Sequence, residues 1–302
     1  MTDIRSNDVM LEWLGTTTFR LRVCDLTLLL DTYVDRPAAA PPVGVTAADL
    51  SADFVFISHS HFDHIVGADV VAKNSGAPVA GSYESIRLLR EANVPEAQLI
   101  PVSGGEFVEC GRDVRVRVYP ALHSCVFMGI SADSGAESVG DLGISQQDRL
   151  ARSGDLLASA MTASPALAEW WAATIKDAPH SSQDGGQLIY LIESGQGSIL
   201  FSASSGCWSP ILRELRPEVA LLACVGRPNL DGEPFQGSLA EFMVREIEML
   251  MPRKVILCHH DAFAGPEVSG EDTTAAVRAI QSRCSYTELV DMTYLNPVPI
   301  LR

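Results

Sequence analysis

Residues 53–64 read Asp-Phe-Val-Phe-Ile-Ser-His-Ser-His-Phe-Asp-His, a short apolar run followed directly by three histidines and an aspartate. A continuously apolar run of this length is typical of a strand that is covered on both faces. In extended backbone His59 and His61 point the same way, whereas Asp63 and His64 lie on the turn into the next helix. Four potential ligands therefore converge from six residues, and neutral imidazoles with a carboxylate suit zinc and similar divalent ions.

Other histidines also follow strands. His123 comes after the alternating strand 112–119, and the pair His259 and His260 comes after the apolar run 254–258. Ligands that project from strand ends into one crevice are held rigidly, as a metal site requires. We therefore expect His123 to complete the coordination that the other two clusters begin. A water bound to such a metal has a pKa of about 7 and is a nucleophile at neutral pH.

Hydrophobic patterning predicts a β-rich and then α/β order that occurs twice. The expected strands are 11–14, 18–23, 26–31, 53–58, 76–80, 98–102, 112–119, 187–193, 198–201, 219–225 and 254–258. The expected helices are 65–73, 82–92, 146–160, 165–176, 238–251 and 273–283. The helix at 238 has a capping box, because Ser238 is followed three residues later by Glu241. This order indicates a duplicated architecture, although we find no sequence repeat.

One segment interrupts the order. Residues 131–187 contain eight acidic and three basic residues, several Gly and Ser, and two of the expected helices. We interpret this segment as a helical cap or lid inserted into a single domain that spans 1–302. Its apolar residues could equally form a contact between copies in a homo-oligomer. The pair Trp170-Trp171 is more typical of core packing than of substrate contact.

Composition limits the classes of function. The 302 residues include 22 basic and 38 acidic side chains, a net charge of −16, which disfavours a nucleic-acid partner. A hydrophobic share of 47% with 20% charged residues excludes a disordered chain. Met1–Met10 lacks the pattern of a signal peptide, and no apolar run is long enough for a membrane span. Seven cysteines without a CxxC pair fit a reducing compartment. We therefore expect a soluble cytoplasmic protein with a small-molecule substrate and no membrane partner.

These motifs resemble those of the metallo-β-lactamase fold hydrolases. In that family His-x-His-x-Asp-His follows a buried strand and is joined by a further His, a Gly-Asp strand end and a final His. Residues 11–19 and 28–31 also look like the branch that contains ascorbate-6-phosphate lactonase and the N-acylphosphatidylethanolamine phospholipases. The resemblance covers Leu11 to about Phe263, apart from the insertion. It implies an α/β (α+β) fold, a four-layer αββα sandwich with the metals at one edge of two sheets.

The resemblance also implies the ligands of one or two metal ions. The first ion would be held by three histidines, namely His59, His61 and His123. The second would be held by mixed ligands, namely Asp63, His64 and His259. His259 is preferred over His260 because residues 258–263 align with the family's His-x-Gly-Thr-Phe ending. His260 would instead donate a hydrogen bond to a metal ligand or contact the substrate. Asp31, at a strand end, would either orient a ligand histidine or serve only as a turn residue.

The chain departs from the family at Ser204. Residues 200–206 read Leu-Phe-Ser-Ala-Ser-Ser-Gly, so a hydroxyl stands where the family has a bridging aspartate. An uncharged hydroxyl is a poor ligand. With serine here, the site lacks the negative charge of the aspartate that would compensate two nearby cations. Three alternatives follow: a dinuclear site bridged only by hydroxide, a mononuclear three-histidine site with Asp63 freed as general base, or a site that only binds.

The residues and the resemblance together favour a zinc- or manganese-dependent hydrolase that acts on a small ester, lactone or amide. Asp63 would orient the attacking water, and His180 or His260 would protonate the leaving group. No cluster of Arg or Lys flanks the metal motifs, which disfavours a phosphodiester, although Arg36 and Arg227 could serve. The alternatives are a binding or sensing protein that kept the scaffold, a non-hydrolytic biosynthetic enzyme and a phosphodiesterase.

Overall fold

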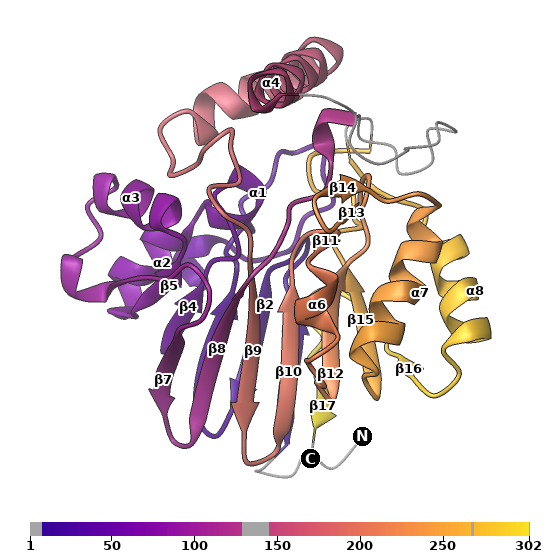
Figure 1. Ribbon diagram of the computed structural model, residues 1–302. Coiled ribbons are helices and arrows are strands. Elements are labelled where there is room, and N and C mark those ends of the chain that lie inside the picture. Colours follow the sequence, from indigo (N-terminus) through magenta and orange to yellow (C-terminus); the bar gives the residue numbers. More distant parts are fainter. Residues whose placement is uncertain (1–7, 129–144, 267–268, 302) are drawn as a thin grey trace.

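The protein, described here by a computed structural model over residues 8–128, 145–266 and 269–301, contains two facing seven-stranded sheets (Figure 1). The first sheet has the strand order β17 (Val298–Leu301), β1 (Val9–Trp13), β2 (Phe19–Val23), β3 (Leu26–Leu30), β4 (Phe54–Phe56), β5 (Val79–Gly81) and β6 (Leu99–Pro101). The second has the order β16 (Glu288–Leu289), β15 (Lys254–Cys258), β12 (Val219–Ala223), β10 (Gly197–Ser202), β9 (Leu188–Ser194), β8 (Val114–Pro120) and β7 (Phe107–Gly111).

Helices cover the outer face of each sheet. Helices α2 (Ala68–Ser75) and α3 (Tyr83–Glu91) pack on the first sheet. Helices α6 (Ser209–Leu212), α7 (Leu239–Leu250) and α8 (Thr274–Arg283) pack on the second. The inner faces of the two sheets share one core, in which Phe19 and Phe201 meet edge to face with ring centroids 6.3 Å apart. This arrangement confirms the predicted αββα sandwich.

Each sheet has an antiparallel part and a parallel part. Strands β1, β2 and β3 run antiparallel, and β4, β5 and β6 continue parallel to β3. In the second sheet β7 to β10 are antiparallel neighbours, and β12, β15 and β16 continue parallel to β10. The two halves of the chain thus have the duplicated architecture that the order of elements predicts. Parallel strands end at one edge of their sheet, where side chains from the loops gather.

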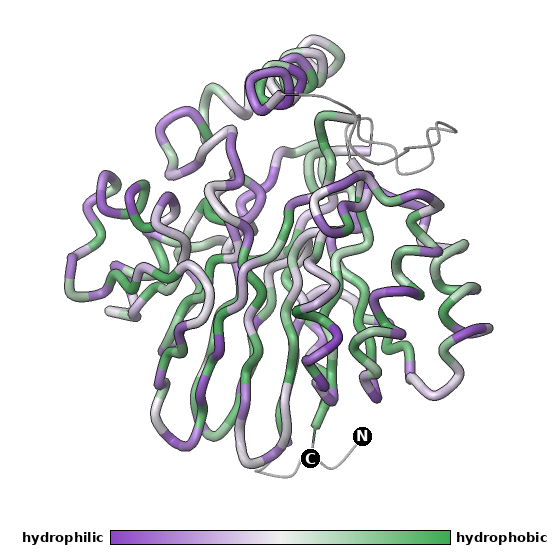
Figure 2. The backbone as a smooth tube through the Cα atoms, in the orientation of Figure 1, coloured by the Kyte–Doolittle hydropathy of each residue, from purple (hydrophilic) through white to green (hydrophobic). Residues whose placement is uncertain are grey.

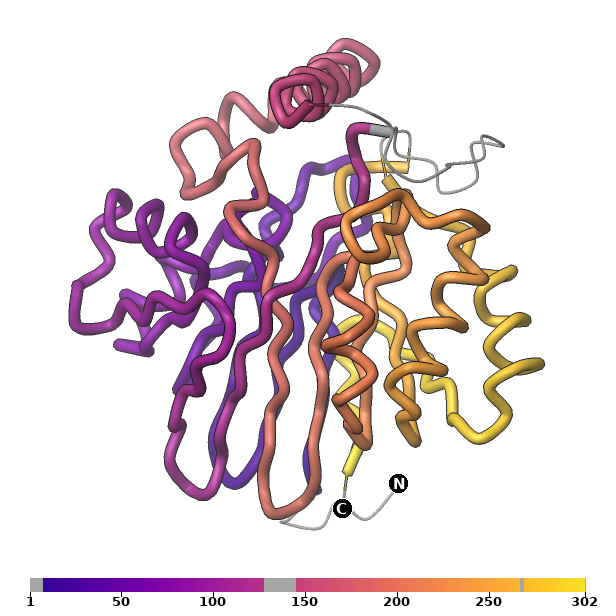
Figure 3. Tube along the Cα trace, viewed as in Figure 1, coloured from indigo at the N-terminus to yellow at the C-terminus, as the bar shows by residue number. Residues whose placement is uncertain are grey.

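Further elements lie above that edge. They are α1 (Phe62–Ile65), α4 (Gln146–Ala163), α5 (Pro165–Trp170), the π-helix Trp171–Ile175 and a small sheet of β11 (Gly206–Cys207), β13 (Asn229–Leu230) and β14 (Glu233–Pro234). Short 3₁₀ turns occupy Ala47–Asp49, Glu96–Gln98 and Val126–Met128. In Figure 3 α4 lies at the end of the sandwich opposite the β7–β8 and β9–β10 hairpins. No helix in the described ranges is both long and apolar enough to traverse a bilayer.

Several predicted boundaries differ from the structure. The predicted helix 65–73 corresponds to α2, which begins three residues later at Ala68, because the backbone turns at Gly67 with φ +94°, where a Cβ would lie 2.9 Å from the Thr32 carbonyl oxygen. The predicted helix 165–176 changes from α5 to a π-helix at Trp171. Patterning missed the strands β7, β11, β13, β14, β16 and β17. Of the proposed insertion 131–187, residues 131–144 lie outside the described residues.

Candidate metal centre

The candidate ligands come from loops that follow strands of both sheets. His59 and His61 follow β4, while Asp63 and His64 lie in α1. The second sheet supplies His123 after β8 and His259 after β15. The loops at this edge therefore bring together six side chains that are up to 200 positions apart in the chain.

Three of these residues form a histidine cluster. The ligand atoms of His59, His61 and His123 lie within 4.8 Å of one another. The centroid of the His61 ring lies 4.9 Å from that of His59 and 4.6 Å from that of His123. Three imidazoles at this separation form a pocket of the size that one divalent cation occupies.

The other three form a mixed cluster with a carboxylate. Asp63 Oδ2 lies 3.4 Å from His259 Nε2 and 3.6 Å from His64 Nε2, and these two nitrogens are 3.2 Å apart. The rings of His59 and His64, one from each cluster, have centroids 3.8 Å apart. The two clusters are therefore neighbours, as two metal sites with a shared substrate would be.

Electrostatics keep the histidine cluster neutral. Burial lowers the pKa of His61 to about 3, and burial also lowers the pKa of His59 and of His123. In the mixed cluster, burial opposes the charge of His64, but Asp63 and Asp31 raise its pKa above the ordinary value. Burial also opposes ionisation of Asp63, yet His64 and His259 hold the pKa of this carboxyl below its usual range. Neutral imidazoles and an ionised carboxylate are the forms that bind metal, so a cation in the mixed cluster would displace the proton that Asp63 and Asp31 favour on His64.

The donor atoms fit a cation. His59 Nε2 is buried, and among the described residues it has no hydrogen-bond partner. His123 Nδ1 lies 2.9 Å from the Ser124 carbonyl oxygen, which accepts its proton and leaves Nε2 as an acceptor. A buried nitrogen lone pair without a donor is costly unless a cation occupies the space beside it. Both clusters thus have the chemistry of divalent-metal sites.

A hydrogen-bond network lies behind the ligands. Asp31, fully buried, accepts a bond from Ser58 N at 2.8 Å, from Ser58 Oγ at 2.9 Å and from Thr17 Oγ1 at 2.6 Å. Its Oδ2 also lies 2.8 Å from His64 Nδ1. Ser58 Oγ lies 3.0 Å from His59 Nδ1. One carboxylate therefore contacts the mixed cluster directly and the histidine cluster through Ser58.

The backbone at the site is held in an uncommon conformation. Thr16, Asp31 and His259 have φ values of +48°, +51° and +61°. Such left-handed backbone costs on the order of 1 kcal/mol at residues other than glycine and persists where surrounding bonds fix it. His259 N donates to Thr16 O at 2.8 Å, and Asp261 accepts from Thr16 N at 3.0 Å. These bonds tie the loop that bears His259 to the first sheet.

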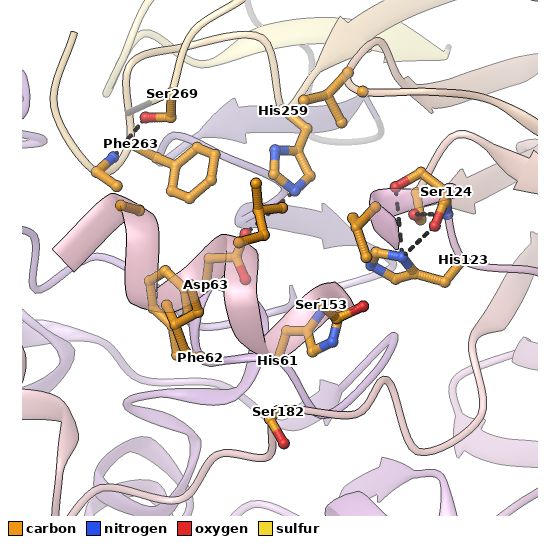
Figure 4. A pocket seen from close by; sticks show the side chains of 18 of the residues that line it. His61, Phe62, Asp63, His123, Ser124, Ser153, Ser182, His259, Phe263 and Ser269 are labelled. Atoms are coloured by element: carbon orange, nitrogen blue, oxygen red, sulfur yellow. Dashed lines mark hydrogen bonds and ion pairs between the residues drawn. The ribbon is translucent and has the colours of Figure 1, made fainter. Parts of the chain in front are cut away.

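A cavity of about 290 Å³ opens beside the clusters. Figure 4 shows His61, Asp63, His123 and His259 around this space. His180 and Ser204 also line it. His180 Nδ1 lies 2.9 Å from the Ala178 carbonyl oxygen, so its Nε2 is the acceptor in the neutral ring.

Other predicted residues lie elsewhere. His260 does not contribute to the cavity among the described lining residues, and its ring stacks on Trp13 with centroids 5.2 Å apart. Arg36 forms an ion pair with Asp261 at 2.8 Å. Arg227 is buried, and its Nη2 donates to the Phe235 carbonyl oxygen.

Sequence reasoning missed several residues at the site. Ser58 and Thr17 join the network on Asp31, and the charge of Asp184 partly opposes the burial that lowers the pKa of His61 and of His123. Trp171, for which the sequence favours core packing over substrate contact, lines the cavity and packs on Phe62, with ring centroids 4.9 Å apart. Its neighbour Trp170 packs against Tyr33 in an aromatic cluster, as core packing predicts.

Residues 27–156 match the model of a β-lactamase superfamily domain. This part of the chain is similar to the β-lactamase superfamily, and the chain as a whole has the metallo-β-lactamase fold. A UPF0173 metal-dependent hydrolase of Pyrobaculum calidifontis is 37% identical over 117 residues, which cover 38% of this chain and 51% of that protein. The chain thus matches about half the length of this relative. The closer resemblance to the lactonase and phospholipase branch stays a prediction.

Solved structures of other proteins share the fold. Igni18 of Ignicoccus hospitalis, described as a metallo hydrolase, superposes with a TM-score of 0.62 at 17% identity, over 96% of this chain and 97% of that one. CmlA of Streptomyces venezuelae, described as a diiron β-hydroxylase, has a TM-score of 0.60 at 15% identity, over 98% and 55% of the two chains. At such identities the likeness concerns the architecture alone. One of these proteins is described as a hydrolase and the other as a hydroxylase, so the same fold carries different chemistries in different proteins.

Proposed function

We propose that this protein with the metallo-β-lactamase fold is a metal-dependent hydrolase of a small, uncharged ester, lactone or amide. The observation that carries the proposal is the position of the two ligand clusters at one wall of a single cavity. Zinc or manganese held by these clusters would supply Lewis-acid polarisation and lower the pKa of a water to about 7. The relatives named as metal-dependent hydrolases support the same class.

The chain's own groups supply positioning and proton transfer. The Asp63 carboxylate, ionised and at the cavity wall, accepts a hydrogen bond from a water and orients it toward the substrate. His180, also at the wall, is held through Nδ1 and presents Nε2 as the group that exchanges a proton with the leaving atom. His260 does not serve as the proton donor, because its ring stacks on Trp13.

The cavity disfavours a phosphodiester. Among its described lining residues none is Lys or Arg, which are the usual partners of phosphate oxygens. Arg36 is occupied by Asp261, and the guanidinium of Arg227 is bound to the Phe235 carbonyl oxygen. An uncharged carbonyl substrate fits this environment better.

Ser204 bears on the number of metals. Its Oγ lies in the cavity wall and accepts a hydrogen bond from Ser124 N at 3.1 Å. The hydroxyl thus anchors the residue after His123 and brings no charge to the space between the clusters. Either a dinuclear site without a carboxylate bridge or a mononuclear site at the three histidines is consistent with this position.

The test is the metal content per chain, measured by elemental analysis of protein purified without added metal or chelator. About two equivalents support the dinuclear hydrolase, and about one supports the three-histidine site with Asp63 as base. Replacing His61 by Ala should remove metal and turnover together. His180→Gln, a matched change outside both clusters, should keep the metal and slow turnover. Turnover that survives His61→Ala would contradict the proposal.

A binding or sensing protein is the second candidate, and the missing carboxylate at position 204 favours it. Such a protein would bind metal tightly and turn over no ester, lactone, amide or phosphodiester. CmlA, with the same fold, is described as a β-hydroxylase, so a non-hydrolytic reaction belongs among the activities assayed.

A further inference from the structure

The roof of the cavity is apolar and comes from the cap. The lining residues contributed by α4, α5 and the π-helix include Leu156, Leu157, Ala160, Leu167 and Trp171. Phe62 and Phe263 extend this surface beside Asp63, as Figure 4 shows. A substrate that reaches the clusters must therefore pass along aliphatic and aromatic side chains.

The cap helix leaves apolar surface available. Residues 146–163 of α4 are all described, and none of their side chains is buried. Leu156 and Leu157 are half-exposed although they face the cavity. Figure 2 shows that this helix carries both hydrophobic and hydrophilic positions. Apolar surface that folding leaves accessible is stabilised when a ligand covers it.

The polar groups of the cavity do not favour an anion. They are hydroxyls such as those of Ser124 and Ser182, the histidines already described, and the carboxylates of Asp63 and Glu271. Glu271 accepts a hydrogen bond from Gly226 N at 3.1 Å. No lysine or arginine is among the described lining residues, so a negatively charged substituent placed at the roof, away from the metal clusters, finds no side-chain cation to compensate it.

We infer that the cap forms a specificity pocket for an apolar acyl or aryl group on an uncharged substrate, and that Leu157 and Trp171 determine this specificity. The inference deepens the proposed hydrolase function and rests on it for the reaction. Leu157 lies on the helical roof, and Trp171 packs edge to face on Phe62. The clusters would then act on the carbonyl while the cap holds the apolar group.

Turnover of esters that differ in acyl-chain length tests the preference of the pocket for apolar groups. Neutral p-nitrophenyl esters from acetate to octanoate should show kcat/KM rising about three- to fourfold per methylene until the cavity is filled. Leu157→Asn should flatten this dependence. Leu150→Asn is the matched control, because Leu150 lies on the same helix, is 38% exposed and is absent from the lining. A wild-type profile that is independent of chain length would overturn the inference.

Binding tests the inference separately from the reaction. The fluorescence of Trp171, identified by comparison with Trp171→Phe, should change on titration with 1-alkanols from butanol to octanol, with affinity rising along the series. Tight, length-dependent alkanol binding without turnover of any ester would leave the pocket standing and remove the hydrolase proposal. Alkanol binding that does not depend on chain length would overturn the pocket.

Discussion

Asp31 is a single buried carboxylate that reaches both ligand clusters. It contacts His64 Nδ1 at 2.8 Å, and through Ser58 Oγ it reaches His59 Nδ1. If Ser58 donates to Asp31 and accepts from His59, the Nδ1 proton of His59 is fixed and Nε2 faces the metal position. Partners behind ligand histidines set their tautomer and orientation, so Ser58 is a positioning residue.

Replacing Ser58 by Ala should weaken metal binding at the histidine cluster by about 10- to 100-fold, since such partners have effects of this size. Competition with a chromophoric chelator measures the affinity. Ser60→Ala is the matched control, because Ser60 is equally buried on the other side of His59 but bonds to Ser85 Oγ at 3.0 Å. Ser58→Thr should restore binding. An equal loss in the Ser58→Ala and Ser60→Ala variants would show that packing alone is responsible.

Local spacing is why the sequence predicts much of this site. The motif at 59–64 is contiguous, and His123 and His259 each follow a recognisable strand. The contact from Ser58 to Asp31 joins positions that no local pattern relates, and the bond from Asp31 to His64 is expected only from the family resemblance, as one of two roles for Asp31. His260 differs from His259 by one residue, and its stacking on Trp13 depends on tertiary structure.

Among the elements, α7 combines a good cap with a buried acid. Ser238 accepts from Glu241 N at 3.2 Å and Glu241 bonds back to Ser238 N, so the predicted capping box is confirmed. Further along, Glu246 is 1% exposed, and its Oε1 lacks a hydrogen-bond partner within the described part of the chain. Burial raises the pKa of Glu246 to about 8.

This raised pKa gives a pH dependence of stability. Between about pH 4.5 and 8 the folded state keeps a proton that the unfolded state has lost, so the free energy of unfolding falls as pH rises. From pH 6 to 8 the free energy of unfolding should fall by about 2 kcal/mol, and Glu246→Gln should abolish this dependence on pH. Urea unfolding at each pH measures the free energy of unfolding. Glu248→Gln, which changes an exposed acid of the same helix paired with Arg283, should keep the wild-type slope.

Element boundaries show where local pattern fails. Periodicity places α3, α7 and α8 to within a residue or two, because each has an apolar face against a sheet. It places no break at Gly67, where close approach to Thr32 requires a turn. Strand β17 pairs with β1 from the far end of the chain, and such pairing leaves little local signal.

At the scale of the whole molecule, the metal centre lies where the two sheets meet. The first sheet supplies His59 and His61 and the second supplies His123, so an ion in the histidine cluster would join the two halves of the sandwich. His259 and Asp63 join the halves in the same way in the mixed cluster. A ligand that binds only the folded state stabilises it by RT ln(1 + [L]/Kd).

Removing the metal should therefore lower the melting temperature of the whole domain in one transition. At a free metal concentration a thousand times Kd, the stabilisation is about 4 kcal/mol, which corresponds to about 6 °C for a chain of this size. Differential scanning calorimetry of metal-loaded protein, before and after chelation, measures the difference. His61→Ala should melt near the chelated wild type and respond less to the chelator. Two separate transitions after chelation would mean that the halves unfold independently, and an unchanged melting temperature would contradict a metal that links the sheets.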